Sequence, residues 1–118
     1  MAEHDPFTVE DVQKRRAAIL NRFEERKLGD MRRILATAEG RRFLWRVLVE
    51  AKIHHSCFDT NALVMAQNEG RRDIGLFVES EILKSVPEAM EQMRSEAASD
   101  RLNREAELLN AEKEKSNG

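Results

Sequence analysis

TAEGRRFLWRVLVEA, residues 37–51, is the stretch that decides the fold. Thr37 is a favourable N-cap, and the large apolar residues after it recur at spacings of one, three and four, which is the period of a helix with one buried face. The residues on that face are Phe43, Leu44, Val47, Leu48 and Ala51. We therefore predict that this helix forms the hydrophobic centre of an all-α protein.

On the N-terminal side the pattern predicts a longer helix and a short one. Thr8 is a candidate N-cap for a helix that ends near Gly29, and Asp30 can begin a short segment over residues 31–36. The long helix carries an apolar stripe of Val12, Ile19, Leu20 and Phe23, and the short segment points Ile34 and Leu35 inward. Residues 1–7 contain Pro6 and no period, and we expect them to form a flexible arm.

On the C-terminal side, turn-forming residues predict a loop over residues 52–60, in which Cys57 and Phe58 are expected to fill part of the core. Asn61 is a candidate cap for a helix that extends to residue 83, with Gly70 as a narrow middle that allows another helix to approach closely. Its predicted buried stripe is Ala62, Met65, Ala66, Gly70, Ile74, Phe77, Val78 and Ile82.

Ser85, Pro87 and Glu88 indicate the start of a last helix, because they combine a capping serine, a first-turn proline and a capping-box glutamate. Its first turns are expected to bury Met90 and Met93. Beyond Ser95 only a thin seam of Ala98, Leu102, Ala106 and Leu109 keeps the helical period. Such a seam is typical of a helix that packs on a neighbouring subunit or frays, and we expect residues 112–118 to be disordered.

The predicted fold is thus a small bundle of four or five helices with a long C-terminal helix. With 118 residues the chain has the length of a single domain, divided here into a helical core domain at residues 8–84 and an acidic C-terminal helix at residues 85–118. The overall net charge is -2, but residues 14–72 contain 14 basic and seven acidic side chains. This basic body can contact phosphates or an acidic protein surface.

No enzyme, metal or cofactor is predicted. His54, His55 and Cys57 match no zinc-ligand spacing, no glycine elbow surrounds a serine, and GxGxxG and GxxxxGK are absent. The single cysteine cannot form an intramolecular disulfide. No apolar run approaches the roughly 20 residues of a membrane span, so we expect a soluble protein made in the cytoplasm.

Four Arg-Arg doublets, at residues 15–16, 32–33, 41–42 and 71–72, lie within or beside the helical stretches. Arginine and tryptophan are enriched at interface hot spots, and Arg41 is spaced to lie over the ring of Trp45. The candidate partner-binding residues are Arg41, Arg42, Trp45, Arg46, Arg71, Arg72, Leu102 and Leu109. Binding to a DNA backbone is an alternative use of the same arginines.

Two segments carry a family resemblance: GRRFLWRVL at residues 40–48 and MAQNEGRRDIGL at residues 65–76. The paired motifs GRRFLW and NEGRRxxGL resemble those of a family of small helical proteins encoded by tailed bacteriophages, over about residues 30–84. The resemblance implies a virion-associated structural protein without catalysis, at the head, the portal vertex or among the internal proteins. Its partners would be other virion proteins, in oligomers or multiple copies, with packaged DNA as a further contact.

Two alternatives to this expectation are a small DNA-binding accessory protein and an assembly chaperone that is absent from the mature particle. Within the fold we expect Glu69 to pair with an arginine of the other Gly-Arg-Arg triplet, which would lock the two central helices together.

Overall fold

The computed structural model describes residues 7–117 and contains four helices: α1 (Val9–Leu35), α2 (Ala38–Ala51), α3 (Ala62–Ser85) and α4 (Ala89–Asn117). Over these residues there is no strand, which confirms an all-α fold with a long C-terminal helix. Residues 1–6 of the expected N-terminal arm, and Gly118, lie outside the described residues.

Three predicted N-caps are confirmed. Thr8 accepts a hydrogen bond from the amide of Asp11, Thr37 from the amide of Gly40, and Asn61 from the amides of Leu63 and Val64. In each case the cap satisfies backbone N–H groups that have no partner within the helix.

The prediction that Ser85 caps the last helix is wrong. Ser85 is the final residue of α3, and its hydroxyl donates to the carbonyl of Glu81 at 2.9 Å. Val86 is the residue that leaves the helix, and the amide of Ala89 donates back to its carbonyl at 3.0 Å. α4 therefore begins after Pro87, one turn later than its sequence signal suggests.

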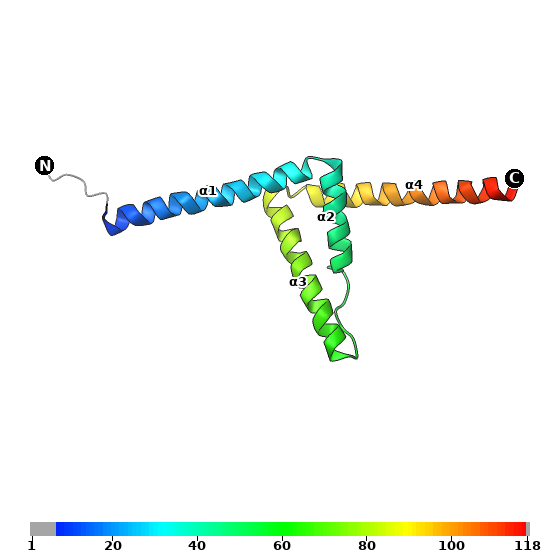
Figure 1. Ribbon diagram of the computed structural model, residues 1–118, viewed down its shortest axis with the longest axis horizontal. Coiled ribbons are helices and arrows are strands. Elements are labelled where there is room, and N and C mark those ends of the chain that lie inside the picture. Colours follow the sequence, from blue (N-terminus) through cyan, green and yellow to red (C-terminus); the bar gives the residue numbers. More distant parts are fainter. Residues whose placement is uncertain (1–6, 118) are drawn as a thin grey trace.

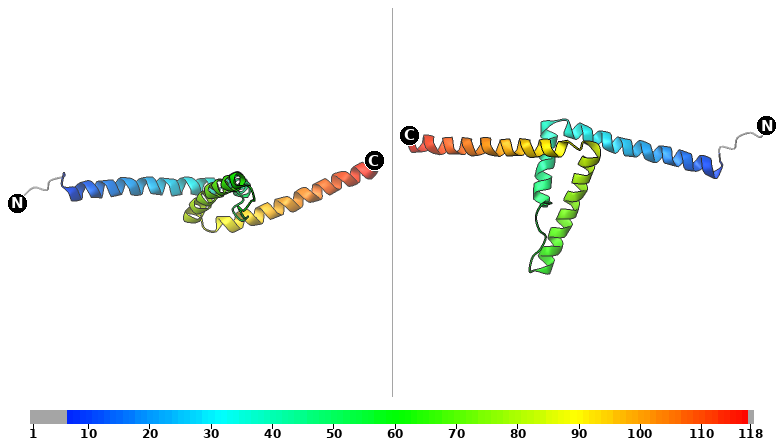
Figure 2. Two further views of the ribbon diagram at one scale, coloured as in Figure 1. Left: turned by 90° about the horizontal axis from the view of Figure 1, so that it is seen from below. Right: turned by 180° about the vertical axis from the view of Figure 1, so that it is seen from behind.

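The four helices form a central hub and two arms. The hub consists of α2, α3, the last turns of α1 and the first turns of α4, and the arms are the remaining parts of α1 and α4. α2 and α3 make a hairpin, while α1 and α4 leave its open end, away from the α2–α3 loop, in opposite directions (Figures 1 and 2). The molecule measures 94 × 39 × 18 Å, and its radius of gyration is 23.2 Å. A compact chain of this length would have a radius of gyration of about 14 Å. The fold is therefore elongated, because most of α1 and α4 lies outside the hub.

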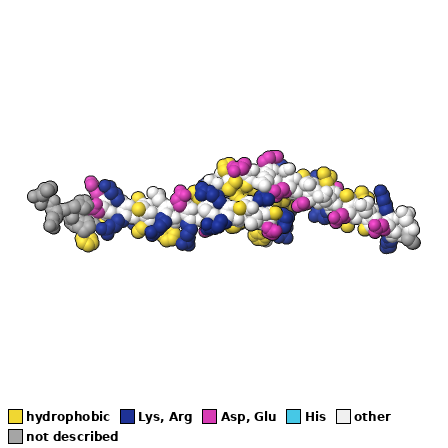
Figure 3. Space-filling model, turned by 90° about the horizontal axis from the view of Figure 1, so that it is seen from above, with side chains coloured by type: hydrophobic (Ala, Val, Ile, Leu, Met, Phe, Trp, Pro, Cys, Tyr) yellow, Lys and Arg dark blue, Asp and Glu magenta, His cyan; other side chains and the backbone are white. Residues whose placement is uncertain are grey.

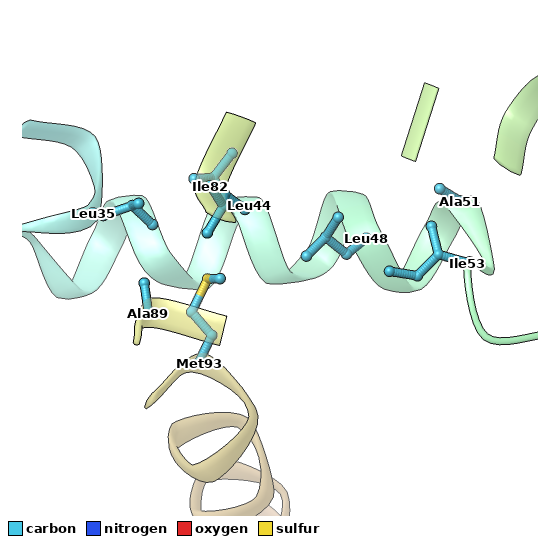
Figure 4. Packing of buried hydrophobic residues seen from close by; sticks show 8 residues of the cluster. All are labelled: Leu35, Leu44, Leu48, Ala51, Ile53, Ile82, Ala89 and Met93. Atoms are coloured by element: carbon cyan, nitrogen blue, oxygen red, sulfur yellow. The ribbon is translucent and has the colours of Figure 1, made fainter. Parts of the chain in front are cut away.

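The hydrophobic core lies where the four helices meet, at the open end of the hairpin, and extends along α2 (Figure 4). Its buried residues are Leu35, Leu44, Leu48, Ala51, Ile53, Ile82, Ala89 and Met93. Met31, Trp45, Val78, Val86 and Met90 are partly buried around it. Since Ala89 and Met93 belong to α4, the boundary expected after residue 84 does not separate the core from the C-terminal helix.

The predicted break near Gly29 is absent, because α1 continues without interruption to Leu35. Met31 and Leu35 hold one face of the helix against the core, and this packing outweighs the weak helix propensity of the glycine. Ile34, which we expected to point inward, is exposed instead.

The predicted buried stripe of α3 is largely wrong. Only Ile82 of that stripe is fully buried, whereas Ile74 and Phe77 are exposed. No atom lies within 4 Å of a Cβ placed on Gly70, so this glycine is not the site of close approach. That site is Gly75, where a Cβ would collide with the side chains of Ala51 and Ile53.

Three smaller expectations also fail. Phe43 is exposed, since the buried face of α2 runs through Leu44, Leu48 and Ala51. Ile53, not Cys57 and Phe58, fills the core below the α2–α3 loop. The C-terminal end is helical through Asn117.

Candidate interaction surfaces

Arg41 is held inside the fold. Its Nε donates to both carboxylate oxygens of Glu96 on α4 at 3.1 Å, and its Nη1 donates to the carbonyl of Leu35 at the end of α1 at 2.9 Å. The side chain of Arg41 is 14% exposed and that of Glu96 is 34% exposed. The hydrogen bond from Arg41 lowers the pKa of the Glu96 carboxyl below its ordinary value. Arg41 thus braces the junction of three helices, and its guanidinium is already occupied.

Around the first Gly-Arg-Arg triplet, at residues 40–42, the other side chains of α2 form a surface that is partly charged and partly aromatic. Trp45 is half-buried against the core, and Arg41 does not lie over its ring. Arg42 is exposed and approaches Glu39 at 3.9 Å. Arg46 lies over the exposed ring of Phe43, with 5.7 Å between the guanidinium carbon and the ring centroid. Arg42 and Arg46 are therefore accessible cations, and Phe43 is an accessible aromatic side chain.

The second triplet lies beside the α2–α3 loop. Arg72 donates from Nε to the carbonyl of Ile53 at 3.3 Å, which ties α3 to the loop. Arg71 lines an open cavity of about 270 Å³ together with Lys52 and His55. Glu69 is exposed, and in the described part of the chain it pairs with neither Arg41 nor Arg42, so the expected lock between the two triplets is wrong.

A large uncovered surface lies on α3 and was missed by sequence reasoning. At about 100° per residue, five residues of α3 share one side of the helix, turned away from the side that holds Gly75 and Ile82. Leu63, Ile74 and Phe77 are 77%, 64% and 60% exposed. We call this surface the α3 apolar face; it consists of Leu63, Ala66, Gly70, Ile74 and Phe77. Its residues Ala66, Gly70, Ile74 and Phe77 belong to the stripe that the sequence predicted to be buried, whereas Leu63 lies outside that stripe.

Each arm carries its own apolar stripe. On α1 the stripe of Val12, Ile19, Leu20 and Phe23 is exposed, and Arg15 and Arg16 complete an open hollow of about 310 Å³ along it. Lys and Arg side chains alternate with hydrophobic ones along this arm (Figure 3). On α4 the seam of Ala98, Leu102, Ala106 and Leu109 is exposed along its whole length, as the thin pattern indicated.

Among residues 7–117 no group of three His, Cys, Asp or Glu side chains could hold a metal ion. In the same part of the chain no helix is both long and apolar enough to cross a bilayer. The exposed features that remain are the α3 apolar face, the accessible arginines and the two arm stripes.

No curated protein and no solved structure matches the chain. Residues 31–95 match a family described as Bbp19-like phage protein. This segment runs from the last turns of α1 to the second turn of α4, so it contains the whole hub, the α3 apolar face and both Gly-Arg-Arg triplets. Because the match spans more than half of the 118 residues, the chain belongs to the Bbp19-like phage protein family.

Proposed function

We propose that this phage protein is a minor structural or assembly component of the tailed-phage particle, at the head, the portal vertex or among the internal proteins. It binds a neighbouring virion protein through the α3 apolar face. The observation that carries the proposal is that Leu63, Ile74 and Phe77 stand exposed on one side of α3, whereas another side of the same helix buries Gly75 and Ile82. Contiguous apolar surface of this kind is typical of protein-binding sites.

The energetics favour a protein partner for this face. Fully burying a leucine, isoleucine or phenylalanine side chain contributes roughly 1.5–3 kcal/mol. Three such residues form an anchor row, and Gly70 lets a partner approach the α3 backbone closely, since nothing within 4 Å occupies the position of its missing Cβ. The exposed Arg42 and Arg46 of α2 provide a separate charged contact surface.

The engaged arginines argue against a surface dedicated to DNA. Of the eight doublet arginines, Arg41 is bound to Glu96 and Arg72 donates to a backbone carbonyl, while the exposed Arg33 and Arg42 each lie near an acidic side chain of their own helix. The net charge of the chain is also -2. A phosphate-binding face would keep more of these guanidiniums free.

The test is the content of the chain in purified particles and in assembly intermediates, measured by quantitative mass spectrometry. Ile74→Asp places a charge on the α3 apolar face without touching the core, so we expect an unchanged melting temperature and at least a tenfold lower copy number in both samples. Glu69→Gln, at a residue that is also exposed on α3 but lies on another side, is the control and should be incorporated like the wild type.

Equal incorporation of Ile74→Asp and the control would overturn the proposal. So would release of the wild-type chain from particles by nuclease or by moderate salt alone, because phosphate contacts weaken steeply with ionic strength while a buried apolar anchor loses less.

A further inference from the structure

The outer part of α4 has no packing partner within the described chain. Every residue from 101 to 117 is exposed, and Figures 1 and 2 show this arm projecting away from the hub. An isolated helix of this length is marginal in water unless an apolar face is covered. Leu102 and Leu109, at 61% and 56% exposed, are the large side chains of the uncovered seam.

The seam is sterically open. Ala89 and Met93 turn one side of α4 into the core. At about 100° per residue, Ala98, Leu102, Ala106 and Leu109 lie on the opposite side of the helix. A second helix can therefore pack along the seam without colliding with the hub of the same chain.

The two edges of the seam differ in charge. One edge has Arg94 and Arg101, seven residues apart, followed by Glu105 and Glu112, also seven residues apart. The other edge has the neutral side chains of Ser99, Asn103 and Asn110. The charged edge is thus basic near the hub and acidic near the tip.

This pattern is complementary to itself in one orientation only. When two identical helices pack antiparallel, the same edge of each copy meets across the seam; when they pack parallel, opposite edges meet. Antiparallel packing centred near residue 103 places Arg101 beside Glu105 of the second copy and Arg94 beside Glu112 of the second copy. Parallel packing would set the charged edge against the neutral one.

The apolar residues fit the same register. The antiparallel alignment brings the two Leu102 side chains together at the centre and places each Leu109 beside the smaller Ala98 of the other copy. Both copies contribute the same patch, as a two-fold symmetric interface requires.

We propose that the chain forms a two-fold symmetric dimer through an antiparallel pair of α4 arms, centred near residue 103. The α3 apolar face stays free on each hub, so the dimer presents two copies of it. This inference rests on α4 alone and does not depend on the identity of the particle partner.

Sedimentation equilibrium of the full chain at low ionic strength provides the test. The wild type is expected to dimerise, and Leu102→Asn to abolish dimerisation while the hub, whose core Leu102 does not touch, stays folded. Arg101→Glu and Glu105→Arg, each alone, place like charges across the seam twice, and each should weaken dimerisation about tenfold. Arg104→Glu, which changes the same charge on the side of α4 away from the seam, should have no effect.

Mixing the two charge-reversed chains tests directly whether Arg101 and Glu105 pair between the two copies. The Arg101→Glu chain and the Glu105→Arg chain, combined in equal amounts, bring opposite charges together again and should form a heterodimer about as tight as the wild-type dimer. A monomeric wild type at high micromolar concentration would overturn the proposal. So would single variants that lose affinity without recovery on mixing, since that result would mean that the charges act only within one helix.

Discussion

Arg41 is the side chain that fixes the angles between three helices. It stands on α2, donates to the last carbonyl of α1 and holds the carboxylate of Glu96 on α4. A cation is favourable at the C-terminus of a helix, where the carbonyls carry partial negative charge. Thr37 adds a second link at the same corner, because its hydroxyl donates to Ile34 and accepts from Gly40.

Replacing Glu96 with glutamine should lower the free energy of unfolding by about 1 kcal/mol, because a mostly buried guanidinium loses its charged partner while Glu96 itself is partly in solvent. Glu69→Gln is the matched control and should leave stability unchanged. Urea denaturation followed by circular dichroism measures both. Equal losses in the two variants would show that the Arg41–Glu96 pair does not brace the hub.

The same pair predicts a dependence on pH. The pKa of Glu96 is lowered in the folded chain, first by the hydrogen bond from Arg41. A lowered folded pKa gives stability that is present above the ordinary glutamate pKa of about 4.3 and is lost as the pH falls through the folded value. The stability difference between wild type and Glu96→Gln should therefore be full at neutral pH and shrink below pH of about 4. A difference that stays constant down to pH of about 3 would contradict this.

At the scale of the helices, two glycines distinguish the buried side of α3 from an exposed side. Gly75 lies on the buried side, and Gly70 lies on an exposed side. Gly75→Ala drives a methyl group into Ala51 and Ile53 and should destabilise the fold by about 1–3 kcal/mol. Gly70→Ala meets open space and should stabilise it by roughly 0.5–1 kcal/mol through helix propensity. Thermal denaturation of the two variants checks the assignment, and the opposite order of melting temperatures would mean that α3 is rotated about its axis.

The helix boundaries show what could be predicted from the sequence. The caps at Thr8, Thr37 and Asn61 were predictable because each is a local interaction over three residues or fewer. The continuity of α1 through Gly29 was not, because the packing of Met31 and Leu35 on the core decides it. Local signals therefore placed most helix starts, and tertiary contacts overrode some helix ends.

The candidate surfaces divide in the same way. The exposed seam at Leu102 and Leu109 was predictable, since too few apolar residues share its period to build a core. The α3 apolar face was not, because α3 is apolar on more than one side and only the position of α2 decides which side is buried. The partner of Arg41 was also beyond local reasoning, since 55 residues separate it from Glu96. Partner binding by Arg42, Arg46 and Arg71 stays a prediction.

At the scale of the whole molecule, the hub and the arms have separate tasks in this account. The family match covers the hub and ends near the points where the arms leave it. We propose that the α3 apolar face of the hub binds a neighbouring virion protein and that the α4 seam binds a second copy of the chain. An elongated shape of 94 Å lets one small chain reach both contacts.

The most direct test of the central claim is electron cryomicroscopy of purified particles and of assembly intermediates. The account predicts density for the four-helix hub in at least one of them, with Ile74 and Phe77 of α3 buried against another virion protein. Hub density whose α3 apolar face is open to solvent or lies on DNA, or the absence of the chain from both samples, would contradict it.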